Sequence, residues 1–316
     1  MAQPLFKRLK ERNGNSVLDV LSPPWCAPLF SRMPEVNEVL VNPFGHGELG
    51  LGARYRLGAQ LREKHYDQTI VLPNSLKSAL VPFFAKIPKR TGYVGEMRRG
   101  LLNDARILQK SRYPLMVERF ALLAEERNAP LRRPLQYPSL ESNPEQQKAV
   151  LEKLGLSPQG KVAIFCPGAE YGPAKRWTHF AELGKMLSEE YEIWLVGSKK
   201  DFEVGEAIRA KCANCHNLCG KTGLDEAVDL LSAAAIVVSN DSGLMHVAAA
   251  LGKPMIAIYG SSSPGFTPPL SDKAVIVKLE LPCSPCFERE CPLGHFDCMN
   301  KLSPEIVYGK IREIAK

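Results

Sequence analysis

Short apolar segments alternate with helix-length segments throughout the second half of the chain, and this alternation constrains the fold most strongly. We expect strands at residues 161–165, 192–196, 236–238, 255–258 and 275–277. We expect helices between them at residues 178–188, 202–211, 224–234 and 244–251. Strands that are apolar at nearly every position are buried on both faces, as in a parallel sheet covered by helices. The second half is therefore predicted to be an α/β domain.

The first half shows the same alternation less regularly. Its expected strands are residues 17–21, 38–41, 69–72 and 89–94, and its expected helices are residues 5–12, 51–63, 75–84 and 115–126. A chain of 316 residues is too long for one ordinary core, so two domains are expected. The proline-rich, polar residues 130–144 are the expected linker, and a helix is expected at 145–154. We assign residues 1–143 to an N-terminal domain and residues 144–316 to a C-terminal domain.

The chain begins with a predicted helix that leads into a strand, at residues 5–12 and 17–21. In a βαβ unit, a helix that leads into a parallel strand follows an earlier strand. We therefore expect one strand and its turn to precede Met1 in the native protein.

The charge and composition of the chain limit the kinds of molecule that it is expected to bind. Lys and Arg outnumber Asp and Glu by 41 to 34, which gives a formal net charge of +7 and favours an anionic partner such as a nucleotide, a phosphorylated glycolipid or a membrane surface. The sequence has no basic run interleaved with aromatic residues, which argues against nucleic acid. No apolar stretch is long enough to span a bilayer, and residues 1–12 lack the apolar region of a signal peptide. The sequence predicts a cytoplasmic protein.

Ligands of an open parallel sheet bind beyond the carboxyl ends of its strands, and three predicted loops there are rich in glycine, small polar and charged residues. The first loop is residues 166–177. In it, Gly168 allows a ligand to approach the backbone closely, and Lys175 and Arg176 can meet a phosphate. Thr178 is predicted to be the N-cap of the helix that follows. The position favours a functional loop over the alternative, a long surface loop with solvated cations.

The second loop is residues 239–246. Asp241 or Ser242 can cap the next helix, and the backbone N–H groups of residues 242–244 form an anion site at its start. His246 lies one turn further on, where it can hydrogen-bond a ligand or a backbone group. The alternative, ordinary capping beside a core histidine, stays open. The third loop, residues 259–268, can close over a phosphate or a sugar.

Three long motifs carry a resemblance to a known family. They are CPGAEYGPAKRW at residues 166–177, SNDSGLMHVAAALGKPMIAIYGSSSPGFTPPL at 239–270 and LPNSLKSALVPFFAKIPKRTGYVGEMRRGLLND at 72–104. They resemble the ADP-heptose:lipopolysaccharide heptosyltransferases of glycosyltransferase family 9, in particular the heptosyltransferase II group, and the similarity runs along the whole chain. The resemblance implies an α/β GT-B fold: two facing Rossmann-like domains with parallel sheets, the first holding the acceptor and the second ADP-heptose.

The resemblance also implies roles for individual residues. Lys175 would act on the leaving diphosphate as the catalytic residue, with Gly168 and Arg176 beside it in the donor site. The remaining donor-site residues would be Asp241, Ser242, Gly243 and His246 around the heptose and phosphates, and Ser198 and Lys199 around the adenosine. For an anionic inner-core acceptor, the first domain offers Asn74, Ser75, Lys77 and Arg98, with Lys89, Arg90 and Arg99 nearby. A solvated basic face is the alternative for these cations.

The implied reaction is inverting transfer of L-glycero-D-manno-heptose to the heptose/Kdo inner core of lipopolysaccharide by a single displacement. It needs a base for the acceptor hydroxyl and positive charge for the departing ADP; no cofactor is required, and stimulation by Mg²⁺ stays open. Members of the family begin with a strand and a Gly-Asp turn that carries the base, and the similarity here starts after that turn. We therefore expect this chain to be less active than one extended upstream by about 10²-fold or more. The resemblance also implies peripheral contact with the inner membrane.

Nine cysteines are many for a cytoplasmic protein, and four of them fall close together at Cys283, Cys286, Cys291 and Cys298. Their spacing suits one tetrahedral site, and we favour a structural zinc, with His295 as an alternative ligand. Two disulfides or four thiols are the other interpretations. A second group, Cys212, Cys215 and Cys219, lacks a fourth partner in the sequence and is predicted to consist of packing thiols.

Two other functions stay open on the sequence alone. One is another GT-B enzyme, either a heptosyltransferase for a different core position or a sugar-nucleotide 2-epimerase. The other is a catalytically inactive protein that binds a nucleotide or a glycolipid, which the expected absence of the base makes reasonable.

Overall fold

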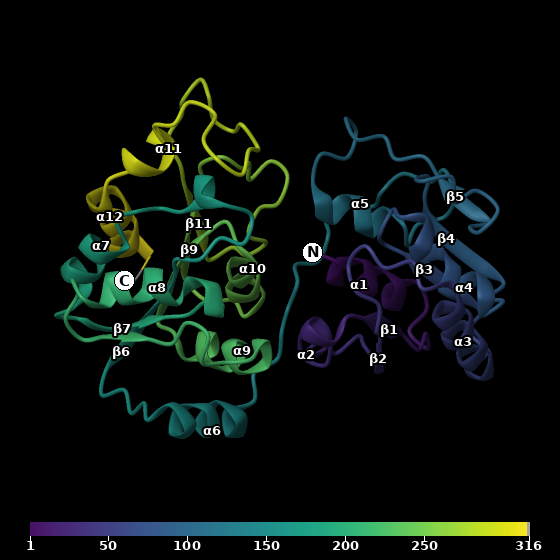
Figure 1. The fold of residues 1–316 in the computed structure, drawn as a ribbon, viewed down its shortest axis with the longest axis horizontal. Coiled ribbons are helices and arrows are strands. Elements are labelled where there is room, and N and C mark those ends of the chain that lie inside the picture. The colour runs from purple at the N-terminus through teal and green to yellow at the C-terminus, as the bar shows by residue number, and fades with distance from the viewer. Residues whose placement is uncertain (315–316) are drawn as a thin grey trace. The chain divides into compact units, whose positions relative to one another are not determined.

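The chain forms two compact α/β units in a computed structural model that describes residues 1–314 (Figure 1). The N-terminal unit comprises Met1–Pro24 and Glu35–Gln136. The C-terminal unit comprises Trp25–Pro34 and the chain from Tyr137 onward. The chain therefore passes between the units three times, and each unit is built around sheets of its own.

The C-terminal unit contains one parallel sheet in the strand order β11-β10-β9-β6-β7-β8. Its strands are β6 (Lys161–Cys166), β7 (Tyr191–Leu195), β8 (Cys215–Asn217), β9 (Ile236–Asn240), β10 (Met255–Ile258) and β11 (Ala274–Val277). The five strands predicted here are confirmed, whereas β8 is an addition. From β6 the chain first adds strands on one side and later returns to add β9 on the other side. The strand order therefore reverses between β6 and β9, which is where parallel sheets bind ligands.

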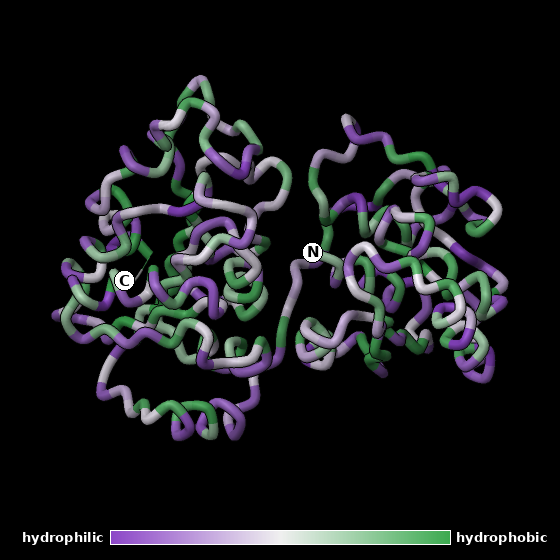
Figure 2. Tube along the Cα trace, viewed as in Figure 1, coloured by the Kyte–Doolittle hydropathy of each residue, from purple (hydrophilic) through white to green (hydrophobic). Residues whose placement is uncertain are grey.

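Helices cover both faces of this sheet, because its strands are apolar on both faces. Alternate residues of β6 enter opposite cores: Ala163 and Phe165 pack in one, and Val162 and Ile164 in the other. The helices are α6 (Pro144–Leu154), α7 (Phe180–Leu187), α8 (Phe202–Arg209), α9 (Leu224–Ala233), α10 (Gly243–Ala250), α11 (Asp297–Asn300) and α12 (Pro304–Ile314). The first core takes residues of α7, α8 and α12, and the second takes residues of α6, α9 and α10. In Figure 2, apolar and hydrophilic turns alternate along α6, as expected of a helix with one buried face.

The N-terminal unit has a two-stranded and a three-stranded parallel sheet. The first pairs β1 (Asp19–Ser22) with β2 (Glu38–Val41), and the second contains β3 (Gln68–Val71), β4 (Lys89–Tyr93) and β5 (Asp104–Arg106). Its helices are α1 (Gln3–Arg12), α3 (Leu51–Leu61), α4 (Leu80–Phe84) and α5 (Met116–Leu122). The predicted elements are confirmed with ends shifted by a few residues, except that the helix expected at residues 75–84 is a 3-10 helix, Leu76–Ala79, followed by α4. β5 is an addition.

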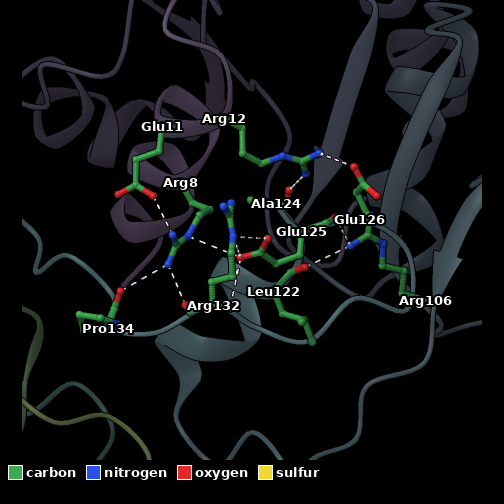
Figure 3. Close-up of polar contacts among 10 residues, drawn as sticks. All are labelled: Arg8, Glu11, Arg12, Arg106, Leu122, Ala124, Glu125, Glu126, Arg132 and Pro134. Carbon is green, nitrogen blue, oxygen red and sulfur yellow. Dashed lines mark hydrogen bonds and ion pairs between the residues drawn. The ribbon is translucent and has the colours of Figure 1, made fainter.

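Arginines of α1 attach this helix to the segment that follows α5 (Figure 3). Arg8 donates from Nη2 to the carbonyl oxygen of Arg132 at 2.7 Å, and its Nε lies 3.5 Å from a carboxylate oxygen of Glu125. Arg12 donates to the carbonyl oxygen of Ala124. Because Arg8 is buried, its charge is stabilised by these partners rather than by water. This cluster holds together parts of the chain that are more than a hundred residues apart.

Residues Trp25–Pro34 lie in the C-terminal unit, which corrects the prediction that residues 1–143 form one domain. The short helix α2 (Ala27–Phe30) packs against α9. Next to it, Arg32 forms a two-pronged ion pair with Asp229 of α9, with N–O distances of 2.9 and 2.6 Å. Both side chains are almost fully buried, so the segment is a fixed part of the C-terminal unit. The main chain then crosses between the units after Gln136, within the predicted linker.

Candidate functional site

The loops after β6 and β9 lie side by side at the carboxyl edge of the C-terminal sheet. The two strands are paired, with Cys166 opposite Ser239 near their ends. The first loop contains a 3-10 turn, Pro173–Lys175, and the second leads directly into α10. Two of the three loops that the sequence analysis selected therefore flank the point where the strand order reverses.

A close ion pair joins these two loops. Nζ of Lys175 lies 2.6 Å from Oδ2 of Asp241, and both side chains are largely buried. The same ammonium group lies 4.9 Å from the centre of the Tyr171 ring, close enough for a cation–π contact. Because the pair is shielded from water, its interaction is stronger than that of an exposed pair. The structure thus brings together the predicted catalytic lysine and a predicted donor-site carboxylate.

Asn240, which the sequence analysis did not select, sets the position of the first loop. Its side chain is fully buried and donates from Nδ2 to the carbonyl oxygen of Pro167 at 2.8 Å. Its Oδ1 accepts from the backbone N–H of Trp177 at 3.1 Å. Asn240 therefore hydrogen-bonds to both ends of the loop that carries Lys175. In the sequence, this role could have been suspected only because Asn240 is a polar residue at the end of an apolar strand.

The start of α10 has no side-chain cap. Ser242 is the N-cap residue, but its side chain does not bond the first helical amides; its Oγ lies 3.2 Å from Oγ of Ser239. Asp241 is paired with Lys175 instead. The prediction that Asp241 or Ser242 caps this helix is therefore wrong for the side chains. The consequence is that the first amides of α10, from Gly243 onward, are not taken by a cap and can meet an anion.

His246 lies on the first turn of α10 and is half-buried. Burial lowers the pKa of His246 below its ordinary value; the carboxylate of Asp241 opposes this shift, and the charge of Lys175 adds to it. The ring is therefore neutral near pH 7 and can both donate and accept a hydrogen bond.

Gly168, Ser198 and Lys199 lie at the neighbouring strand ends. A side chain at position 168 would place its Cβ 2.4 Å from a carboxylate oxygen of Asp201, so the close approach requires glycine. Asp201 in turn accepts hydrogen bonds from the backbone N–H and the hydroxyl of Ser198, at 2.9 and 2.7 Å. Ser198 and the exposed Lys199 follow β7, beside the loop after β6. These residues share the sheet edge with Lys175.

Thr178 is not the N-cap of α7, which corrects the prediction. The helix begins at Phe180 and its N-cap residue is His179, without a side-chain cap. The hydroxyl of Thr178 donates instead to the side-chain oxygen of Asn300 at 3.2 Å. Arg176, just before it, keeps its predicted place beside Lys175, and its Nε is buried without a hydrogen-bond partner.

The four predicted acceptor residues lie in the N-terminal unit, and the structure gives Arg98 a different role. Arg98 is only 1% exposed, and its guanidinium donates to the carbonyl oxygens of Tyr93 and Pro73 and to the side-chain oxygens of Ser78 and Asn74. A buried cation needs its donors satisfied within the protein, so Arg98 fixes the loop 73–78 and is not available to a ligand.

Three other residues of that loop keep some exposure. Asn74 is exposed, and Ser75 and Lys77 are partly exposed. Of the nearby cations, Arg90 is also structural, because it donates to the carbonyl oxygens of Leu101 and Ile87 at 2.6 Å each. Lys89 and Arg99 are exposed. The acceptor residues that stay available are thus Asn74, Ser75 and Lys77.

The four clustered cysteines line one cavity of about 20 Å³, together with Ala174, Ser261 and His295. None of the four is in a disulfide. Burial and then the three neighbouring thiols raise the pKa of Cys298, whereas hydrogen bonds from backbone amides, the first from Phe296, lower that of Cys291. Within the described residues 1–314, no three His, Cys, Asp or Glu side chains are arranged to hold a metal ion as they stand.

The second group of cysteines packs as predicted in all three positions. Cys212 and Cys219 are buried in the core between the sheet and helices α7, α8 and α12, and Cys215 is partly buried against it.

Among residues 1–314, each helix is too short or too polar to cross a membrane.

Known proteins resemble this chain along nearly its whole length. The family model described as glycosyltransferase family 9 (heptosyltransferase) matches residues 54–297. The lipopolysaccharide heptosyltransferase 2 of Salmonella typhimurium is 47% identical, with 99% of this chain and 94% of that protein covered. The lipooligosaccharide heptosyltransferase 2 of Haemophilus influenzae is 46% identical, with 99% and 95% covered.

Solved structures give the same result for the fold. The structure of E. coli ADP-heptose lipopolysaccharide heptosyltransferase II matches with a TM-score of 0.88 and 44% identity, over 99% of this chain and 94% of that one. A glycosyltransferase family 9 structure from Veillonella parvula, at 18% identity, matches with a TM-score of 0.83 over 99% and 92%, and so supports the fold alone. The predicted GT-B fold is confirmed. Because the family model covers most of the chain and the relatives cover nearly all of it, the chain belongs to glycosyltransferase family 9, the heptosyltransferases.

Proposed function

We propose that this chain is a heptosyltransferase II, which transfers L-glycero-D-manno-heptose from ADP-heptose to the heptose/Kdo inner core of lipopolysaccharide with inversion at the anomeric carbon. Two relatives of that name are 47% and 46% identical over 99% of the chain. The observation that carries the proposal is the Lys175–Asp241 pair beside the uncapped start of α10, at the edge of the sheet where ligands bind. Alternatives outside this family have no comparable support.

In the proposed reaction an acceptor hydroxyl gives its proton to a general base and attacks the anomeric carbon while the bond to ADP breaks, so negative charge develops on the diphosphate. Lys175 is held at the site by Asp241 before the donor binds, and the amides of Gly243 and Leu244 point outward from the start of α10. These groups supply positive charge at fixed positions in a site from which water is partly excluded. Such a preorganised arrangement stabilises a transition state effectively. The neutral ring of His246 can orient a sugar hydroxyl or a phosphate oxygen by hydrogen bonding.

The proposed partners follow from the two units. ADP-heptose would bind the C-terminal unit, at Lys175, Arg176, Asp241 and Gly243. The anionic inner-core glycolipid would contact Asn74, Ser75 and Lys77 of the N-terminal unit. Since the acceptor is a lipid and the chain carries a net charge of +7, we also propose a cytoplasmic enzyme that touches the inner membrane peripherally.

The test is a transfer assay with purified chain, ADP-heptose and an inner-core acceptor that carries one heptose, read by mass spectrometry. We expect the acceptor to gain the mass of one heptose. Lys175→Met should lower kcat about 10²-fold or more, because removing one such charge from a transition state has that effect. The matched control is Lys185→Met, an exposed lysine in the last turn of α7 and outside the site, which should leave kcat unchanged. Hydrolysis of ADP-heptose without transfer, or an unchanged rate in Lys175→Met, would contradict the proposal.

We also propose that the four cysteines hold a structural zinc ion and that the transfer chemistry itself needs no cofactor, with Mg²⁺ as an optional stimulant. The support for zinc is the convergence of Cys283, Cys286, Cys291 and Cys298 on one small cavity. Their sulfurs are not arranged as a metal site as they stand, so binding requires them to move together. Such an ion would tie a loop and would take no part in transfer.

A further inference from the structure

Buried polar atoms without partners gather at one edge of the C-terminal sheet. Across the described residues 1–314, four buried side-chain nitrogen or oxygen atoms have no hydrogen-bond partner. Three of them belong to the C-terminal unit: Nε of Arg176 and the hydroxyl oxygens of Ser261 and Ser262. Native proteins satisfy nearly all such groups, so an unpartnered one calls for an explanation such as a bound ligand. All three follow β6 or β10, at the carboxyl end of the sheet.

Contacts of Ser261, the residue before Ser262, place the loop after β10 next to the loop of Lys175. Ser261 and Ala174, the residue before Lys175, line the same cavity. The cysteine-rich segment 283–298 joins the two loops: Phe287 donates from its backbone N–H to the carbonyl oxygen of Ser261 at 2.6 Å, and Ala174 donates to that of Arg289 at 3.1 Å. The loops after β6 and β10 are therefore fixed relative to each other.

The loop after β10 also lies beside the start of α10. β10 pairs with β9, and Asp241 donates from its backbone N–H to the carbonyl oxygen of Ile258, the last residue of β10, at 3.1 Å. Tyr259 then places its hydroxyl 3.5 Å from the sulfur of Met245 in α10 and bonds the carbonyl oxygen of Thr267 at 2.7 Å, which closes the loop on itself. Ser262 is thus in a closed turn whose first residues, Ile258 and Tyr259, contact Asp241 and Met245 at the start of α10.

We propose that Ser262 is a further donor-binding residue: its hydroxyl, with Nε of Arg176, donates hydrogen bonds to the diphosphate of the nucleotide-sugar. Ser262 is 8% exposed, so little water reaches its hydroxyl, and a phosphate oxygen is the acceptor that the neighbouring charges favour. Ser261 is not assigned this role, because it lines the cysteine cavity. The inference rests on the proposed function, which supplies the diphosphate as ligand.

The experiment measures binding of ADP and of adenosine to the full chain by calorimetry. Adenosine lacks the diphosphate, so a phosphate-binding hydroxyl affects ADP alone. We expect Ser262→Ala to weaken ADP binding about tenfold, the usual effect of losing a hydrogen bond to a charged group, and to leave adenosine binding unchanged. Ser262→Thr, which keeps a hydroxyl, should restore most of the affinity. Ser263→Ala is the matched control, because the Ser263 hydroxyl accepts from Gly265 within the turn at 3.0 Å, and it should bind ADP as the parent chain does.

Thermal unfolding without nucleotide separates a ligand role from a structural one. Ser262→Ala removes a buried hydroxyl that bonds nothing in the protein, so its melting temperature should equal or exceed that of the parent chain. A lower melting temperature with an unchanged ratio of ADP to adenosine affinity would overturn the inference. A parent chain that binds no ADP at all would instead overturn the proposed function, so the two failures are distinguishable.

Discussion

Arg98 is a fully buried charged side chain of the N-terminal unit, and its guanidinium donates to two backbone carbonyl oxygens and two side-chain oxygens. We predict that Arg98→Gln destabilises this unit by about 3 kcal/mol, because several buried acceptors lose their donor together. Urea unfolding followed by circular dichroism measures the change. Arg99→Gln, at the exposed neighbouring position, is the control and should change stability by less than about 0.5 kcal/mol. If Arg98→Gln instead had normal stability and a raised KM for the acceptor, Arg98 would be an acceptor-binding residue and not a structural one.

Single residues of the site differed in how far the sequence could place them. Lys175 and Asp241 could be selected because each follows an apolar strand, but their ion pair spans 66 positions and depends on β6 lying beside β9. The buried state of Arg98 could not be predicted, because a basic residue in a polar segment is normally exposed. Asn240 was missed because its role is visible only once both loops are in place.

Elements were predictable where they are long and apolar. The strands β6, β9 and β10 are fully buried apart from one end residue, which follows from the run of apolar side chains in each. The strands β5 and β8 have three residues each, Asp104–Arg106 and Cys215–Asn217, and most of their side chains are polar. A short polar strand can be identified only from its hydrogen bonds to a neighbouring strand, and the local sequence pattern does not predict that pairing.

The cysteine-rich segment yields a prediction about metal content. If its four thiolates bind zinc, the purified chain should contain about one zinc per molecule by elemental analysis, and Cys283→Ser with Cys286→Ser should lose it. Cys212→Ser is the control, because Cys212 is buried in a separate core, and it should keep the metal. Four thiols that react with a thiol reagent in the metal-free parent chain, with no change in melting temperature on adding zinc, would contradict the zinc proposal.

The division of the whole molecule was predictable only in part. A linker rich in proline and polar residues pointed to the crossing after Gln136, but nothing in the sequence marks Trp25–Pro34 as part of the C-terminal unit. That assignment rests on long-range contacts: α2 packs against α9, and Arg32 pairs with Asp229, 197 positions away. Long-range pairs between single charged residues have no periodicity, so sequence patterns do not reveal them.

The position of Trp25–Pro34 leads to a test of the C-terminal unit by itself. All three tryptophans of the chain, Trp25, Trp177 and Trp194, lie in this unit, so tryptophan fluorescence reports its unfolding and not that of the N-terminal unit. Arg32→Ala leaves the carboxylate of Asp229 buried without its cation, and we predict a loss of about 3–5 kcal/mol. The fluorescence transition in urea should therefore move to lower concentration.

The control for this change is Arg209→Ala, which removes the partner of Glu206 from an ion pair on the surface of the same unit. Exposed pairs contribute little, so its fluorescence transition should move by less than about 1 kcal/mol. Arg32→Ala combined with Asp229→Asn should recover part of the lost stability, because the uncompensated charge is then gone. If Arg32→Ala behaved like the control, the Arg32–Asp229 pair would not be what holds the segment Trp25–Pro34 to the C-terminal unit.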